Sequence, residues 1–447
     1  MRRPRVGAAL LLALALGLSG CEEGGGTATT APGTSSITSS VTITAPTTVT
    51  SAAIAATTTA PAPPEHHIGV RTVDGAGRFY NRLTGEEFVP RGNNYVRLGQ
   101  QTTADGSSTF GHALFDPGRY DAATVAADLA RMHVDGYNVV RVFLSPDTLG
   151  AESGGLSPEY MKNVVDFLGH SRDTEMYVIF TLDWLPGGRY GEILNADCCD
   201  EFALMNANFL PPAGVAANQA FFRDFASELI DRGAAVEHVM AYQVRNEMFF
   251  DSDQPPLSFS AGVFTTANGS SYDMSLAAER EAMIREGAIF FVDSVAAAIR
   301  EVDPSVLVSV GLFVPHGPNS VRVGDPRLVV SGPIIWESTL DFVDLHAYTG
   351  FELDLPEHVE NFGVDGMEER PIVMGEFGGE VSRFPSTSAA ALAMRDWQVE
   401  SCLLGFDGWI FWTWDLFEQP DFFHALMDGG AINGVLAPVI RPDPCTT

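Results

Sequence analysis

Short apolar segments that alternate with helix-like segments run through most of this chain. They restrict its fold more than any other feature. Eight segments have the length and composition of buried strands: Val89–Tyr95, Val139–Leu144, Tyr177–Leu182, Val239–Val244, Val306–Gly311, Phe342–His346, Ile372–Gly375 and Trp409–Trp412. Three of the stretches between them have a helical pattern: Asp121–Val134, Ser275–Val302 and Ala389–Leu404. Near-continuously apolar strands are typical of a parallel sheet covered by helices. The alternation therefore predicts an α/β fold, either a doubly wound open sheet or a closed barrel.

The length of the chain and its first strand favour the barrel. A domain of roughly 380 residues with long insertions fits a (β/α)8 TIM barrel whose βα loops are elaborated. A doubly wound sheet would usually carry a glycine-rich phosphate turn after its first strand, and Gly92-Asn93-Asn94-Tyr95 is no such turn. The segments Val70–Val73 and Arg78–Asn81 flank a glycine-rich turn and predict a short N-terminal β-hairpin. We assign residues 67–447 to this barrel domain.

The N-terminus has the features of an export signal. Three arginines precede the apolar run Val6–Leu18, which is too short to span a bilayer comfortably. The run ends in Leu18-Ser19-Gly20-Cys21, which resembles the lipobox of bacterial lipoproteins, where the cysteine receives the lipid. The alternative is an ordinary cleaved signal peptide. We expect residues 1–21 to be a lipoprotein signal peptide that ends at Cys21. The protein would then be anchored by a lipid at Cys21 on the extracellular face of a bacterial membrane, or else be secreted.

Composition excludes some classes of partner. Residues 22–66 are rich in Thr, Ser, Ala and Pro and have few large apolar side chains, so we interpret them as a disordered linker. The formal net charge of −31 argues against a nucleic-acid partner, because phosphate binding needs clustered Lys and Arg. The charge is compatible with a neutral polysaccharide as substrate. We expect a monomer whose only contact with the membrane is the lipid.

The remaining four cysteines are Cys198, Cys199, Cys402 and Cys445. In an oxidising compartment they allow three disulfide connectivities. We favour a bond from Cys445 to Cys402, which would hold the C-terminal tail. No Cys or His pairs have finger-like spacing, so zinc is a poor alternative. We expect neither a metal nor another cofactor.

Polar and aromatic residues recur where the predicted strands end. In order they are Arg141, Asn246-Glu247, His346 and Tyr348, Glu376, and Trp412. The carboxyl ends of barrel strands face one mouth, where active sites lie, so these residues should converge. Two glutamates on opposite strands suit cleavage of a glycosidic bond, since one protonates the leaving oxygen and the other attacks the anomeric carbon. Arg141 beside Glu376 would keep that carboxylate ionised.

These residues resemble those of the clan A glycoside hydrolases, and of glycoside hydrolase family 5 in particular. The resemblance covers about Ile68 to Pro438. It implies that Glu247 is the acid/base, that Glu376 is the nucleophile, and that Tyr348 orients it. The further substrate-binding residues that we assign are Arg141, Asn246, His346, Trp412, Asp183, Trp184 and Asn94. In one place the sequence departs from the family, because Asp183 stands where the family has a histidine after strand three.

Three other functions remain as alternatives. A metal-dependent barrel hydrolase would need His-x-His near the first strand, and none is present there. A transglycosylase would use the same covalent intermediate, and a glycan-binding barrel would use the same cleft without catalysis. We expect a retaining, endo-acting hydrolase of a β-1,4-glucan or mannan. The endo action is inferred from the long loops with aromatic residues after strands three and four, which could equally close a pocket and give an exo-acting enzyme. Trp184, Phe249 and Trp336 are candidate platforms for sugar rings.

Overall fold

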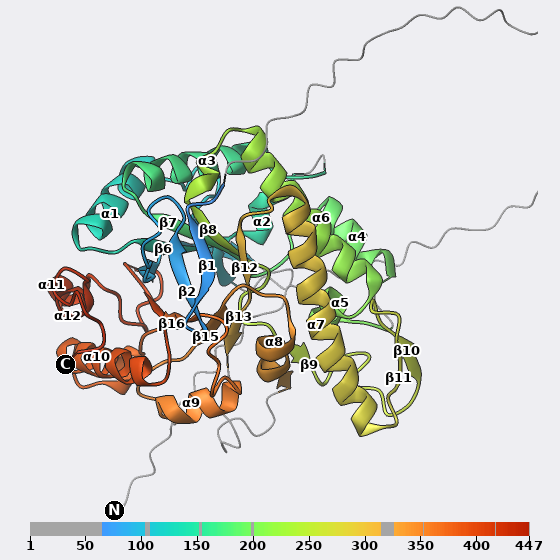
Figure 1. Ribbon diagram of the computed structural model, residues 1–447. Coiled ribbons are helices and arrows are strands. Elements are labelled where there is room, and N and C mark those ends of the chain that lie inside the picture. Colours follow the sequence, from blue (N-terminus) through green and yellow to red (C-terminus); the bar gives the residue numbers. More distant parts are fainter. Residues whose placement is uncertain are drawn as a thin grey trace, which may run out of the picture. The chain divides into compact units, whose positions relative to one another are not determined.

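The structure is a computed structural model, and it describes residues 65–102, 108–151, 154–197, 201–313, 326–351, 353–415 and 417–446. The barrel is built from residues 63–99 and 110–447 (Figure 1). The signal peptide with Cys21, most of the linker, and Cys198 and Cys199 lie outside the described residues. The predictions made for them stay predictions.

A parallel sheet of nine strands forms the centre of the fold. Its order is β12-β8-β7-β6-β3-β17-β16-β15-β13. The strands are β3 (Arg91–Asn94), β6 (Val139–Leu144), β7 (Tyr177–Leu182), β8 (Val239–Gln243), β12 (Leu307–Ser309), β13 (Gly311–Phe313), β15 (Val343–His346), β16 (Ile372–Phe377) and β17 (Gly408–Phe411). The two end strands, β12 and β13, are separated only by Val310. One continuous segment thus pairs with β8 through its first half and with β15 through its second half. The sheet therefore closes into a (β/α)8 barrel, as predicted.

Helices follow the strands and cover the outside of the barrel (Figure 1). They are α1 (Ala122–Val134), α2 (Pro146–Leu149), α3 (Pro158–Asp173), α4 (Arg189–Leu194), α5 (Leu204–Phe209), α6 (Pro212–Asp231), α7 (Ala277–Val302), α8 (Ser331–Glu337), α9 (Leu355–Phe362), α10 (Thr387–Leu403), α11 (Met427–Gly430) and α12 (Asn433–Leu436). Asp121 caps α1, because its side chain accepts hydrogen bonds from Ala123 N and Thr124 N. None of the described helices has the length and apolarity to cross a membrane.

The N-terminal hairpin closes the end of the barrel where the strands begin. Strands β1 (Ile68–Val73) and β2 (Ala76–Asn81) pair antiparallel around the predicted turn. Ile68 and Phe79 are buried in one cluster with interior residues such as Val139 and Phe342. The hairpin thus removes apolar surface from water at the end opposite the site, which stabilises the barrel.

His66 corrects the predicted start of the domain. We placed it in the linker, but it is fully buried. Its Nδ1 lies 2.7 Å from Val239 O, and its Nε2 lies 2.7 Å from Asp303 Oδ1. The folded domain therefore begins at or before His66, since a buried imidazole with two polar partners belongs to the packed core.

The loops after the strands carry short strands of their own. These are β4 (Leu98–Thr102), β5 (Ser108–His112), β9 (Phe250–Asp251), β10 (Val263–Thr265), β11 (Ser271–Asp273) and β14 (Arg327–Leu328). A disulfide joins Cys402, at the end of α10, to Cys445 in the C-terminal tail. This confirms the predicted pairing of these two cysteines.

Candidate active site

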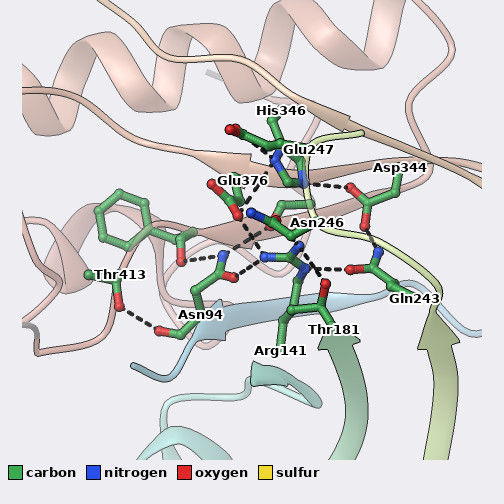
Figure 2. A network of polar contacts seen from close by, with 12 residues as sticks. Asn94, Arg141, Thr181, Gln243, Asn246, Glu247, Asp344, His346, Glu376 and Thr413 are labelled. Atoms are coloured by element: carbon green, nitrogen blue, oxygen red, sulfur yellow. Dashed lines mark hydrogen bonds and ion pairs between the residues drawn. The ribbon is translucent and has the colours of Figure 1, made fainter. Parts of the chain in front are cut away.

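Arg141 lies at the centre of a polar network inside the mouth of the barrel (Figure 2). Its side chain is fully buried. The guanidinium donates five hydrogen bonds, to Gln243 Oε1 (2.7 Å), Asn94 Oδ1 (2.9 Å), Glu376 Oε1 (2.6 Å), Thr181 Oγ1 (3.3 Å) and Asn246 Oδ1 (2.7 Å). An arginine side chain has five N–H donors, so each contact uses one of them. The network links side chains of β3, β6, β7, β8 and β16 and fixes them relative to one another.

Glu376 is held from two sides on β16. Its Oε1 accepts from Arg141, and its Oε2 accepts a 2.6 Å hydrogen bond from Tyr348 Oη. Burial raises the pKa of this carboxyl, and the positive charges of His346 and Arg141 oppose the rise without cancelling it. Arg141 therefore acts in the predicted direction, but burial has the larger effect. Both oxygens are oriented, which suits a group that must attack one atom of a substrate.

Glu247 follows β8 in a backbone conformation that side chains rarely adopt, with φ at 42°. Such a conformation costs on the order of 1–3 kcal/mol and is often found at functional sites. Glu247 Oε1 lies 3.1 Å from His346 Nδ1. About a third of the Glu247 side chain is exposed, whereas that of Glu376 is almost fully buried. Burial alone would raise the pKa of Glu247, but the hydrogen bond and charge of His346 outweigh burial and lower it.

The two glutamates and His346 lie close together. One oxygen of Glu247, one oxygen of Glu376 and one ring nitrogen of His346 all lie within 4.8 Å of one another. This spacing would also allow a metal ion. However, Arg141 already donates to Glu376 Oε1, and a second cation at that oxygen would be repelled. The arrangement favours two carboxylates that act on one bond.

Two asparagines that bond Arg141 differ in burial. Asn94 is fully buried and donates to Gly375 O and Phe411 O, while its own backbone carbonyl accepts from Thr413 Oγ1. We predicted that Asn94 binds substrate, and the structure shows it holding Arg141 and two strands together. Asn246 is only partly buried. Because its Oδ1 accepts from Arg141, its amide nitrogen is the group directed away from the guanidinium.

Trp412 lies at the site, and Trp414 does not. Trp412 packs with Phe143, at a ring-centroid distance of 5.8 Å, in a small cluster that also contacts Tyr348. Trp414 is fully buried against Tyr137 and below the guanidinium of Arg131. If the strand extended through both residues, strand alternation would predict that the two indoles point the same way. That prediction from the sequence is wrong, because β17 ends at Phe411.

Asp183 and Trp184 share one partner, Arg245. The Arg245 guanidinium lies 3.8 Å from Asp183 Oδ1 and 4.5 Å from the centre of the Trp184 ring. Arg245 is itself buried. The carboxylate that replaces the family's histidine therefore balances a buried cation, and one face of the Trp184 ring is covered.

The two other candidate platforms differ. Phe249 packs at the edge of Phe313, the last residue of β13, and Arg327 lies over both rings. Trp336 lies on α8 and donates a 2.6 Å hydrogen bond to Gly363 O, at the end of α9. Because α8 is on the outside of the barrel, Trp336 lies away from this site, and the prediction that it forms a sugar platform there is wrong.

Sequence reasoning missed several residues of the site. Gln243 and Thr181 bond Arg141, and Asp344 contacts both Gln243 and His346. All three point into the barrel from within strands. The available signal in the sequence was a polar residue at an inward-facing position of an otherwise apolar strand. His112 was also missed. Its ring stacks on Phe143 at 3.8 Å between centroids, and burial lowers its pKa to about 4, so it is a neutral imidazole.

A family model shows the family of this chain, and solved structures show its fold. The family model described as cellulase (glycosyl hydrolase family 5) matches residues 98–418. Similar solved structures include an exo-β-1,4-mannosidase from Opitutaceae bacterium strain TAV5, with 16% identity and a TM-score of 0.54 over 84% of this chain and 63% of that one. They also include an endo-1,4-β-mannanase from Rhizomucor miehei, with 13% identity and a TM-score of 0.55 over 84% of this chain and 100% of that one. A comparison with curated proteins finds no match.

Proposed function

Because the chain belongs to the cellulase family, glycosyl hydrolase family 5, we propose that it is a retaining β-glycoside hydrolase with Glu376 as nucleophile and Glu247 as acid/base. The observation that supports this most is the short distance between the two carboxylates, within 4.8 Å between oxygens. Retaining enzymes place these groups about 5–5.5 Å apart, whereas inverting enzymes leave about 6.5–9.5 Å for a water molecule.

The proposed reaction has two steps. Glu376 attacks the anomeric carbon while Glu247 gives its proton to the leaving oxygen, so that the glycosidic bond breaks and a glycosyl-enzyme ester forms. Glu247 then takes a proton from water, whose oxygen attacks the same carbon and releases Glu376. Tyr348 and Arg141 hold Glu376 throughout. The amide nitrogen of Asn246 is placed to donate to a sugar hydroxyl near the nucleophile, and Trp412 supplies a ring for stacking.

We propose a β-1,4-linked mannan or glucan as the substrate. Solved structures with this fold include enzymes named for β-1,4-mannan, so mannan is the first polymer to test. The long loops after β7 and β8, with Trp184 and Phe249, support binding of an extended chain. Product chromatography on mannans, glucans, xylans and aryl β-glycosides distinguishes hydrolysis from transglycosylation and endo from exo cleavage. Binding without any products would support a non-catalytic barrel.

Two variants test the assignment of roles. Glu376→Gln should reduce turnover at least about a thousandfold while the fold is retained, because the amide is a poor nucleophile. Glu247→Ala should spare aryl glycosides with good leaving groups, which need little acid assistance, and azide should restore its turnover. Full activity of the Glu376→Gln variant would show that the nucleophile is misassigned. Equal losses on all leaving groups would argue against Glu247 as the acid.

We also propose that the protein is anchored by a lipid at Cys21 on the extracellular face of the membrane, and that residues 22–66 are a tether. This rests on the lipobox-like sequence and the linker composition.

A further inference from the structure

His346 is placed between three carboxylates, two of which belong to the proposed catalytic pair. Its Nδ1 lies 3.1 Å from Glu247 Oε1 and 3.5 Å from Glu376 Oε1. Its Nε2 lies 3.4 Å from Asp344 Oδ1 on the opposite side of the ring (Figure 2). A single imidazole therefore faces a catalytic carboxylate with one nitrogen and a third carboxylate with the other.

Asp344 is unusual because its carboxylate is fully buried below the site. Its Oδ2 accepts a hydrogen bond from Gln243 Nε2, which in turn orders Arg141. The neighbouring strand leaves room for it only because residue 375 is glycine, since a Cβ there would overlap Asp344 Oδ1. A buried carboxylate is costly unless a positive group or a donor compensates it. Among the described residues Oδ1 accepts no hydrogen bond, and its ion-pair partner is the His346 imidazole, with Nε2 at 3.4 Å.

Four charged groups surround the His346 imidazole. Glu247 approaches from the end of β8, Glu376 from β16 and Asp344 from its own strand, while Arg141 is the cation that faces it. Strand β13 presents only Gly311, where a Cβ would lie 3.0 Å from the ring. Burial alone would lower the pKa of His346, but Glu376, Asp344 and Glu247 outweigh burial and raise it to about 9. The charged, doubly protonated imidazole is thus the favoured form at neutral pH.

We propose, on the basis of the function proposed above, that Asp344 is a positioning residue that keeps a proton on His346 Nε2, so that His346 Nδ1 and Glu247 share the proton delivered to the glycosidic oxygen. Before substrate binds, this proton lies on His346, and the charge and hydrogen bond of the imidazole lower the pKa of Glu247. When substrate replaces water, the proton moves from Nδ1 to Glu247 Oε1 and then to the leaving oxygen. Water returns it in the second step, so no proton is gained or lost over the cycle.

The matched experiment compares two buried Asp–His pairs of this chain. Asp344→Asn removes the charge beside His346, and Asp303→Asn removes it beside His66, at the opposite end of the barrel. The pH profile of kcat/KM is measured on mannohexaose, or on the oligosaccharide that the panel above identifies. For Asp344→Asn the alkaline limb should move to lower pH by roughly one unit or more, because a nearby negative charge favours the protonated pair. Asp303→Asn should leave both limbs unchanged.

Leaving-group dependence separates positioning from a merely structural role. Asp344→Asn should lose about tenfold or more on the oligosaccharide and much less on a dinitrophenyl β-glycoside, which needs no acid. Equal losses on both substrates with an unshifted profile would overturn the proposal.

A measurement on the wild-type protein covers the case in which Asp344→Asn does not fold. In a ¹⁵N NMR titration, His346 should keep both ring nitrogens protonated through neutral pH and titrate near pH 9. His346→Gln provides the assignment by difference. Titration near the ordinary value of about 6.5 would overturn the proposal. If wild-type protein hydrolyses no β-glycoside, the proposed function fails, whereas the titration still reports on the Asp344–His346 pair by itself.

Discussion

Arg141 Nη1 lies 2.6 Å from Glu376 Oε1, and both side chains are almost completely removed from solvent. Removing one partner of such a pair leaves a buried charge without compensation. Arg141→Met should therefore lower the free energy of unfolding by about 3–5 kcal/mol, measured by urea denaturation at pH 7. The loss should shrink at low pH, where the unpaired Glu376 becomes protonated.

An exposed ion pair gives the control for this prediction. Arg285 bonds both oxygens of Glu337, and both side chains are about half exposed. Arg285→Met should lower the free energy of unfolding far less than Arg141→Met does, because solvent screens the pair. If both variants lowered the free energy of unfolding equally, burial would not determine how much the Arg141–Glu376 pair contributes to stability.

Removal of the Tyr348 hydroxyl should change the acidic limb of the pH profile. Its hydrogen bond lowers the pKa of Glu376, so Tyr348→Phe should raise that pKa further. A nucleophilic carboxylate must be ionised, and activity is lost as pH falls through its pKa. The acidic limb of kcat/KM should therefore move to higher pH, with roughly tenfold lower activity at pH 5. Tyr160→Phe, at a fully buried tyrosine outside the site, should not move this limb.

The sequence predicted the barrel because all eight apolar segments overlap strands of the sheet. The strand over 306–311 is interrupted at Val310, which no apolar pattern could show. Its two halves pair with different neighbours. The hairpin and the start of α1 were also predictable, since turn and capping residues act locally. His66 was misplaced because its burial depends on Asp303, which lies 237 residues away.

The site was predictable where a residue matches the pattern of the resembled family. Arg141 within β6, Glu376 within β16 and Glu247 after β8 converge as expected. Asp344 and Gln243 have no place in that pattern and were not recognised, because their importance comes from a partner on another strand. Trp336 was misassigned because composition does not reveal which surface of the barrel a helix presents.

The Cys402–Cys445 disulfide should contribute measurably to stability. It closes a loop with a sequence separation of 43 residues. Chain-entropy arguments give about 4 kcal/mol for a loop of this length. Replacing both cysteines by Ser should lower the free energy of unfolding by that order. Reductant should destabilise the wild-type protein in the same way and should have little further effect on the double variant. A loss below about 1 kcal/mol would show that native packing already holds the C-terminal tail.

A single substitution at Cys21 tests the proposed lipid anchor. Cys21→Ser removes the sulfur that would receive the lipid, so the full-length protein should move from the membrane fraction to the soluble extracellular fraction. Cys402→Ser serves as the control, because that cysteine is accounted for by its disulfide. Continued membrane association of the Cys21→Ser variant after a high-salt wash would contradict lipidation at this position.

Two tryptophans separated by one residue should differ in whether the same substitution changes KM. Trp412 is buried in a small cluster that contacts Tyr348, so Trp412→Ala should lower kcat/KM by about tenfold to a hundredfold through a higher KM, in addition to the stability lost with its packing. Trp414 is fully buried outside the site, so Trp414→Ala should cost about 3–5 kcal/mol of unfolding free energy and leave the KM of the folded enzyme unchanged. Steady-state kinetics and urea denaturation on both variants provide the comparison. If Trp412→Ala changes only stability, Trp412 does not stack with substrate, and the sugar platform must be another ring at the mouth.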